Sequence, residues 1–338
     1  MLYVTTRNEQ EAFTVQHVLN RSRGEDGGLY LPLHFPVLSE AELNALAGKS
    51  FNQRVADLLN LFFSTKLTLW DIDFSAGRYP VRLEAFPNKL WMAELWHNPD
   101  WRYARLEGHL LELIGTRSAA PGSWCTIAVR MAILGAILGE RSELGDGTVD
   151  LVMVSGDFTV PISAWYLRKM GFPVGNIVCC CNENNQLWEL FCHGQMRTDD
   201  AVISSVIPEA DVALPVNLER LISGCGGREA VTRYLYSVSN SFGYSASDAM
   251  LQELRKGLYV SVVSSNRVET AIPNIYNSYR YLMTPASALA YSGLMDYRSK
   301  TGINRPAVVL CDNSPACDAD RIQQVMGLTP AEFNRMMR

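Results

Sequence analysis

The chain has 338 residues, of which 48% are hydrophobic and 19% charged, a balance typical of a globular protein with a well-filled core. Its formal net charge of −5, with arginines scattered singly, argues against nucleic-acid binding, because phosphate recognition needs clustered Lys and Arg. No stretch approaches the ~18 apolar residues of a membrane helix, and the N terminus lacks the apolar segment typical of a signal peptide. We therefore expect a cytoplasmic protein without membrane contact.

The first part of the chain carries more helix signals than strand signals. A glycine turn at residues 26–28 leads into a short extended segment that ends at Pro32. Apolar residues between 55 and 63 recur at i, i+3 and i+4, which predicts the core face of a helix. We predict a mostly helical unit over residues 1–90, with little β structure. Capping patterns predict helix starts at Asn8, Ser39, Ser50 and Thr329.

The middle of the chain has the pattern of a β-α-β unit. A buried strand is predicted at 149–154, followed by a helix from Pro161 to Met170 that stops at Gly171. A second strand is predicted at 177–181. Such a unit implies a parallel sheet covered by helices. Near the C terminus, Thr284 and Pro285 begin a helix, and residues 306–310 form another apolar strand.

The eight cysteines do not have the spacing of a zinc site, because no C-x-x-C pair occurs. Cys179, Cys180 and Cys181 are consecutive in a predicted strand, so neighbouring side chains point to opposite faces and cannot converge on one metal. We interpret the cysteines as small buried hydrophobic residues in a reduced cytoplasm, and we expect no metal site.

Short motifs occur in a fixed order at Tyr3–Arg7, Asp26–Pro32, Gly156–Val160, Lys169–Pro173, Asn182–Asn184, Asp211 with Asn217–Arg220, and Thr284–Ala288. Together they resemble the signature of threonine synthases. This resemblance implies an α/β protein with the fold of type II pyridoxal enzymes, similar to tryptophan synthase β, and it implies pyridoxal phosphate as the family's cofactor. The chain is interpreted as a truncated member of that fold with a mostly helical N-terminal unit.

The family's catalytic lysine has no counterpart in this sequence. The run from Glu94 to Arg105 resembles the family's E-L-F-H-G-P-T-x-x-F-K-D segment, and the lysine position falls on Ala104. A Schiff base needs a primary amine, which a methyl group cannot supply. Lys89 is the nearest lysine, in what reads as a solvated turn, and Lys169 has the place of a helix-end cation. His97 and Asp100 could form an acid–base pair, although such a spacing in a loop is more often structural.

The loop that would hold the cofactor phosphate is also altered. Resemblance assigns it to Gly156, Asp157, Phe158 and Thr159, where the family has G-N-F-G. Phosphate cradles rely on closely approaching backbone N–H groups, which a Cβ atom at position 159 obstructs. Asp157 places a negative charge where a dianion would bind. We therefore expect no covalently held pyridoxal phosphate and weak binding of the free cofactor.

A whole segment of the family is missing from the sequence. Family members carry an α/β portion with a substrate-phosphate loop between the lysine helix and the next helix, whereas here only a short linker near 115–122 remains. We predict that the small domain is deleted there, leaving residues 1–90 as the N-terminal unit and residues 91–338 as the remaining large domain. The family's run that approaches the pyridine nitrogen is replaced at residues 310–317.

Three functions are compatible with these residues. The preferred interpretation is a catalytically inactive threonine synthase-like protein with a binding, regulatory or assembly role, whose partner is an unidentified small molecule or protein. The alternative is an active pyridoxal-phosphate-dependent lyase that converts O-phosphohomoserine to threonine. A third is an enzyme that uses the old cleft without the cofactor. Tryptophans at 91, 96, 101 and 124 either repack the exposed core or form a contact patch, through which a homo-oligomer could assemble.

Overall fold

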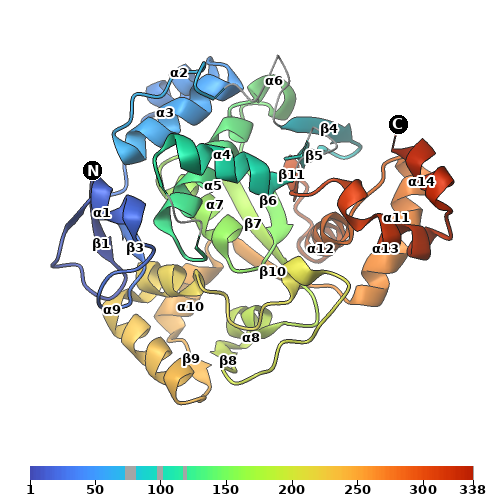
Figure 1. The fold of residues 1–338 in the computed structure, drawn as a ribbon. Coiled ribbons are helices and arrows are strands. Elements are labelled where there is room, and N and C mark those ends of the chain that lie inside the picture. Colours follow the sequence, from blue (N-terminus) through green and yellow to red (C-terminus); the bar gives the residue numbers. More distant parts are fainter. Residues whose placement is uncertain (73–80, 97–101, 117–119, 338) are drawn as a thin grey trace.

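A six-stranded sheet forms the centre of the molecule in a computed structural model that describes residues 1–72, 81–96, 102–116 and 120–337. All of its strand pairs are parallel except that between β4 and β5. Figure 1 shows the sheet with the N-terminal elements at one end of the molecule and the last two helices at the other. The strand order is β10 (Leu258–Val262), β7 (Val174–Cys181), β6 (Val149–Val154), β11 (Ala307–Cys311), β5 (Leu90–Glu94) and β4 (Arg82–Phe86).

The three apolar strands predicted from the sequence occupy the centre of this sheet. β7, β6 and β11 are adjacent, and almost all of their side chains are buried. Strands that are covered on both faces need apolar side chains on both faces, which is why these segments lack polar alternation. The predicted parallel α/β arrangement is therefore confirmed for these strands.

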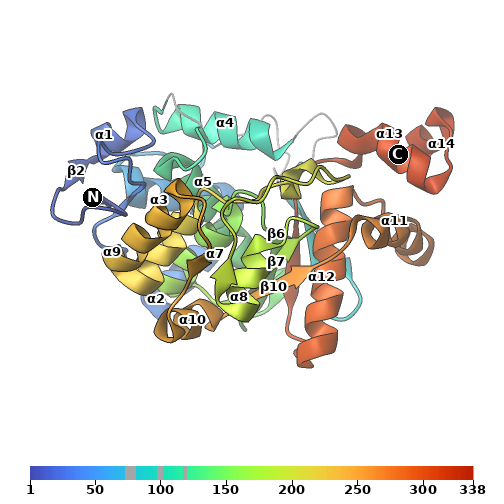
Figure 2. The same ribbon diagram turned by 90° about the horizontal axis from the view of Figure 1, so that it is seen from below.

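Two hydrophobic cores lie on opposite faces of the sheet. One contains side chains of α3 (Phe51–Phe63), α5 (Trp124–Leu138) and α7 (Thr159–Lys169), and the other contains side chains of α11 (Ser265–Tyr279) and α12 (Pro285–Thr301). Figure 2 shows these two groups of helices on either side of the strands. Helix α5 is apolar nearly all round because it is buried by neighbours on every side, including α3 and α7.

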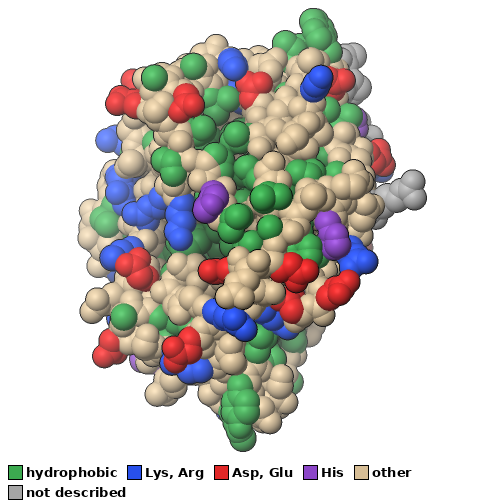
Figure 3. All heavy atoms as spheres, turned by 90° about the vertical axis from the view of Figure 1, so that its left-hand side faces the viewer, with side chains coloured by type: hydrophobic (Ala, Val, Ile, Leu, Met, Phe, Trp, Pro, Cys, Tyr) green, Lys and Arg blue, Asp and Glu red, His purple; other side chains and the backbone are tan. Residues whose placement is uncertain are grey.

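The N-terminal residues contain more β structure than the sequence predicted. β1 (Leu2–Thr5) pairs antiparallel with both β2 (Phe13–Thr14) and β3 (Tyr30–Pro32). The prediction of little β structure here was wrong. These strands were missed because segments of two to four residues are too short to show an alternating pattern. The Tyr3 hydroxyl, fully buried, donates to the Phe62 carbonyl at 2.6 Å and joins this sheet to α3. On the side of the molecule that carries these elements, hydrophobic side chains gather in the middle of the surface (Figure 3).

Three of the four predicted helix starts are confirmed. The Ser39, Ser50 and Thr329 hydroxyls accept bonds from backbone N–H groups in the first turns of α2 (Glu40–Ala47), α3 and α14 (Pro330–Met336). Asn8 does not begin a helix, because its backbone N–H is bonded instead to the Thr5 hydroxyl at 2.9 Å. Helix α7 begins at Thr159, two residues before the predicted start.

The β4–β5 hairpin spans position 90, the predicted boundary between the N-terminal unit and the large domain. Among the described residues, no helix is long and apolar enough to cross a membrane.

The other helices are α1 (Val15–Asn20), α4 (Tyr103–Leu113), α6 (Arg141–Leu144), α8 (Gln186–His193), α9 (Leu218–Ser239), α10 (Asp248–Arg255) and α13 (Ala319–Met326), with short 3-10 turns at Pro208–Ala210 and Pro315–Asp318. A small pair of strands, β8 (Gln195–Met196) and β9 (Tyr244–Ser245), lies outside the main sheet.

Candidate functional site

A cavity of about 370 Å³ lies at the carboxyl ends of β6 and β11. Open parallel sheets bind ligands at this edge, because the loops that follow adjacent strands meet there. Its walls are the first two turns of α4 and α5, the first turn of α7, residues from the segments 120–121, 155–157 and 209–212, and Asp312, which follows β11 directly. The cavity is therefore the candidate ligand site of the molecule.

The loop between β6 and α7 brings most of the predicted cofactor residues to this cavity. Gly156, Asp157 and Thr159 line it, whereas the Phe158 side chain is fully buried in the core. Gly156 and Phe158 both have positive φ, at 46° and 68°, which turns the chain sharply into the helix. Asp157 Oδ1 accepts from the Thr159 backbone N–H, and its Oδ2 accepts from the Thr159 hydroxyl, both at 2.8 Å. The aspartate thus occupies the first backbone N–H of α7.

Asn217, which precedes α9, fixes this loop from the other side. Its backbone N–H donates to the Asp157 carbonyl at 3.1 Å, and its side-chain Nδ2 donates to the Thr159 hydroxyl at 2.9 Å. The side-chain oxygen of Asn217 in turn accepts from Arg220. The loop therefore has few polar groups left for a ligand.

Arg220 is fully buried and joins three separate parts of the chain. In addition to Asn217, its guanidinium donates to the carbonyls of Tyr30 and Gly122, both at 2.8 Å from Nη2. None of these partners is a carboxylate, so burial lowers the pKa of Arg220 to about 10. The side chain remains charged at neutral pH. It holds the N-terminal sheet, the segment before α5 and the loop together.

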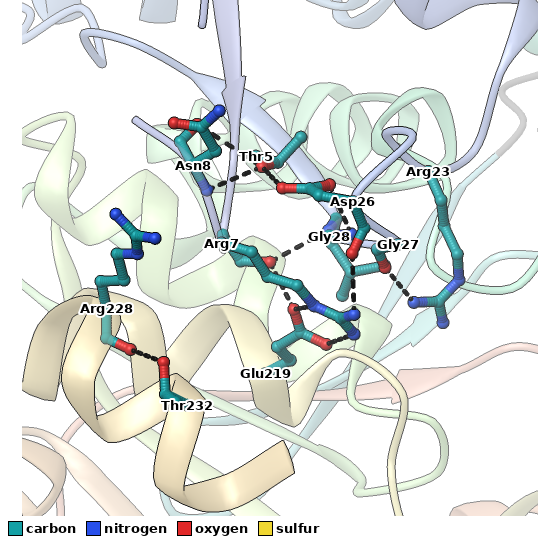
Figure 4. Close-up of polar contacts among 12 residues, drawn as sticks. Thr5, Arg7, Asn8, Arg23, Asp26, Gly27, Gly28, Glu219, Arg228 and Thr232 are labelled. Atoms are coloured by element: carbon teal, nitrogen blue, oxygen red, sulfur yellow. Dashed lines mark hydrogen bonds and ion pairs between the residues drawn. The ribbon is translucent and has the colours of Figure 1, made fainter. Parts of the chain in front are cut away.

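Glu219, the neighbour of Arg220, binds the N-terminal motif. Arg7 donates from Nε and Nη2 to the two carboxylate oxygens of Glu219, each at 3.0 Å, and the Thr6 hydroxyl donates to the same carboxylate. Arg7 also donates to the Asp26 carbonyl at 3.0 Å. Figure 4 shows Arg7 between the Asp26 turn and α9. The motifs at 3–7, 26–32 and 217–220 thus meet in one structural joint beside the site.

A buried arginine that sequence reasoning missed forms another wall of the cavity. Arg130 of α5 donates to both oxygens of Asp312, at 3.0 and 2.8 Å, and its guanidinium carbon lies 3.2 Å from the centre of the Tyr103 ring. The Tyr103 backbone N–H donates to the Asp312 carbonyl at 2.8 Å. A lone arginine within the apolar run 124–138 was the available signal, since a buried charge needs a partner.

The cavity carries more negative than positive side chains. Glu107 of α4 also lines it, one helical turn from Tyr103, whose hydroxyl lies 3.4 Å from Glu107 Oε1. Burial raises the pKa of Glu107, and the nearby Arg130 opposes this rise. Among the described lining residues, four are carboxylates and one is a cation. The carboxylates are Glu107, Asp157, Glu209 and Asp312, and the cation is Arg130.

No lysine reaches this cavity. All six lysines lie within the described part of the chain, and none of them lines it. Ala104, at the lysine position of the family, is exposed near the start of α4, and it is Tyr103 that faces the cavity. Lys89 lies in the β4–β5 turn with a φ of 55°, and Lys169 lies at the end of α7 over the Trp165 ring, where burial lowers its pKa.

The remaining residues singled out by sequence have structural places or are not described. His97, Asp100 and Trp101 lie outside the described residues. Trp124 is fully buried against Tyr3 and Phe62, which supports the repacking interpretation for this tryptophan. The consecutive cysteines of β7 are buried, as predicted, and burial raises the pKa of each thiol. No group of three metal-ligating side chains occurs among the residues described.

Comparison with known proteins gives a consistent family. Residues 2–74 match the family model for the N terminus of threonine synthase. The threonine synthase of Pseudomonas aeruginosa is 22% identical over 435 residues, covering 98% of this chain and 92% of the relative. Human threonine synthase-like 2 is 25% identical over 443 residues, covering 98% and 90%.

The fold matches solved structures of threonine synthases. A threonine synthase from Brucella melitensis with bound PLP superposes with a TM-score of 0.84 at 18% identity, covering all of this chain and 94% of the other. Identity at this level shows the fold and leaves the activity open. The chain therefore resembles threonine synthases over nearly its whole length and has the α/β fold of their solved structures.

Proposed function

We propose that this protein is a catalytically inactive threonine synthase-like protein, which uses the cavity beside β6 and β11 to bind a ligand in a regulatory or assembly role. The observation that carries the proposal is the absence of any lysine from the lining of the cavity. Schiff-base formation needs a primary amine within reach of the cofactor aldehyde. Tyr103 stands in the wall at this point, and the phenol of tyrosine cannot form that bond.

The short connection between α4 and α5 supports the same proposal. The alignment with the Pseudomonas enzyme extends over 435 residues although this chain has only 338, so about a hundred positions of the relative have no counterpart here. In this chain α4 ends at Leu113 and α5 already begins at Trp124. Both ends of this connection are held by hydrogen bonds. The Thr116 hydroxyl donates to the Leu19 carbonyl of α1 at 2.7 Å, and Arg220 of α9 donates to the Gly122 carbonyl. A substrate-phosphate loop has no room in so short a connection.

The alternative is an active pyridoxal-phosphate-dependent lyase of threonine synthase type. Its support is the full-length match to a family whose solved member binds PLP, together with a retained cavity at the expected edge of the sheet. The two proposals differ in one chemical bond, between a lysine of this chain and the cofactor.

That bond is tested by incubating the purified protein with pyridoxal phosphate, recording its absorbance, reducing with borohydride and mapping modified lysines by mass spectrometry. We expect no saturable absorbance band near the visible edge, and only low labelling spread over exposed lysines. The control variants Lys89→Arg and Lys256→Arg should each remove the label from one of these sites and leave the others unchanged. A single lysine labelled stoichiometrically, with a band that borohydride abolishes, would establish the lyase alternative instead.

A further inference from the structure

The start of α7 is the natural anion site of this cavity. A helix that directly follows a parallel strand presents unpaired backbone N–H groups and the positive end of its dipole to the sheet edge. Helix α7 has eleven residues and follows β6 after a turn of four residues, and its first residue, Thr159, lines the cavity. A cofactor of the family's type would place its phosphate at such a point.

In this chain a carboxylate of the protein already makes those contacts. Asp157 Oδ1 accepts from the Thr159 backbone N–H and Asp157 Oδ2 from the Thr159 hydroxyl, at 2.8 Å each. The Thr159 side chain is itself buried and is held by Asn217 at 2.9 Å, so it cannot turn away to admit a ligand without breaking that bond. The residues present therefore do not fit a cofactor phosphate.

The charges around the loop add to this misfit. Glu107 and Glu209 line the same cavity, and the only cation among its described lining residues, Arg130, has both of its Nη atoms bonded to Asp312. An incoming dianion would meet Asp157 at the helix start and two further carboxylates, and the described lining residues offer it no unpaired cation. Electrostatic repulsion of this kind is not screened inside a partly buried cavity as it is at the surface.

We infer that the Asp157 carboxylate is an intramolecular replacement for the cofactor phosphate, which closes the start of α7 to phosphate-bearing ligands. The inference builds on the proposed function but concerns a different contact, because anion exclusion depends on the loop and Schiff-base formation depends on a lysine. Inorganic phosphate separates the two, since it cannot form a Schiff base.

The test is isothermal titration calorimetry with inorganic phosphate, and in parallel with pyridoxal phosphate, at low ionic strength. The double variant Asp157→Gly/Thr159→Gly removes the carboxylate and the obstructing side chain, and Asp157→Asn removes only the charge while keeping an oxygen that can accept from Thr159. Asp248→Asn is the matched control, because Asp248 lies in the first turn of α10 outside the cavity. Circular dichroism checks that each variant is folded.

We expect the wild type and Asp248→Asn to bind phosphate too weakly to saturate, and the double variant to bind it at least about tenfold more tightly. Asp157→Asn should show an intermediate gain in phosphate affinity. If the double variant does not fold, the comparison of Asp157→Asn with the wild type is the test. Wild-type protein that binds phosphate as tightly as the variants, or folded variants with no gain, would overturn the inference. A lysine adduct with pyridoxal phosphate in the wild type would instead count against the proposed function.

Discussion

Single buried charges decide how this chain is held together around its cavity. Arg220 is fully enclosed, yet all of its partners are neutral oxygens. Arg130, also buried, has a carboxylate partner in Asp312. The two arginines therefore have different tasks, since one satisfies carbonyls from distant segments and the other forms an ion pair in the cavity wall.

Arg220→Leu should lower the free energy of unfolding by roughly 3 kcal/mol, because it leaves the Tyr30 and Gly122 carbonyls buried without donors. Urea denaturation followed by circular dichroism measures the change. Arg233→Leu on the same helix is the control, and we expect it to change stability by less than about 0.5 kcal/mol, since Arg233 is exposed. Equal effects of the two substitutions would show that Arg220 is not a structural joint.

Asp318 should make stability depend on pH in the acid range. Burial, with Glu209 nearby, raises the pKa of Asp318 to about 6. The folded state therefore holds this proton more tightly than the unfolded chain does. The stability that the proton adds to the folded state is complete below the unfolded pKa of about 4 and is lost as the pH rises through about 6.

The variant Asp318→Asn should therefore melt at a higher temperature than wild type at pH 7, and the difference should shrink at pH 4. Differential scanning calorimetry at the two pH values measures it. A melting difference that is the same at both pH values would contradict a raised pKa at this position.

At the scale of elements, the apolar strands were the most predictable part of the molecule. β6 and β11 could be predicted because runs such as residues 149–154 are apolar, rich in valine and short, which favours a buried strand over a helix. β1 and β3 could not, because a few residues next to a turn carry no clear period and depend on pairing with each other. Capping boxes at Ser39 and Thr329 were reliable since they are local hydrogen bonds.

The candidate site was predictable only in part, for a related reason. The loop at 156–159 could be located from its motif, but the pairing of Arg130 with Asp312 joins residues 182 positions apart, and no local pattern encodes it. Similarly, the bond from Arg220 to Tyr30 spans 190 positions. The side chains that shape the cavity are thus set by tertiary packing and not by local sequence.

The pairing of α5 with the segment after β11 gives a prediction at this scale. Asp312→Ala should lower the free energy of unfolding by roughly 2 kcal/mol, because it leaves the Arg130 charge buried without its carboxylate; the partial exposure of Asp312 keeps the loss below that of a fully buried pair. Removing both charges, in Arg130→Met/Asp312→Ala, should cost less than the single change. Chemical denaturation of the three proteins checks this, and a double variant less stable than Asp312→Ala would show that the charge is not what matters.

At the scale of the whole molecule, the chain has the fold of solved threonine synthases, and α4 and α5 are joined by residues 114–123 alone. Self-association across the region that the missing segment would cover remains a prediction. Trp101, the tryptophan proposed to anchor such contacts, lies outside the described residues. Sedimentation velocity of the wild type and Trp101→Ala would show whether the assembly exists and depends on that side chain.

The central claim is that the protein does not make threonine. The most direct measurement is threonine formation from O-phosphohomoserine, with excess pyridoxal phosphate, by wild-type protein and by Ala104→Lys. We predict no turnover above the protein-free rate for either protein, since Ala104 is exposed near the start of α4 and the lining of the cavity contains no lysine. The proposed loss of the substrate-phosphate loop leads to the same expectation. Turnover by the wild type would contradict the claim outright, and turnover by Ala104→Lys alone would show that only the anchor had been lost.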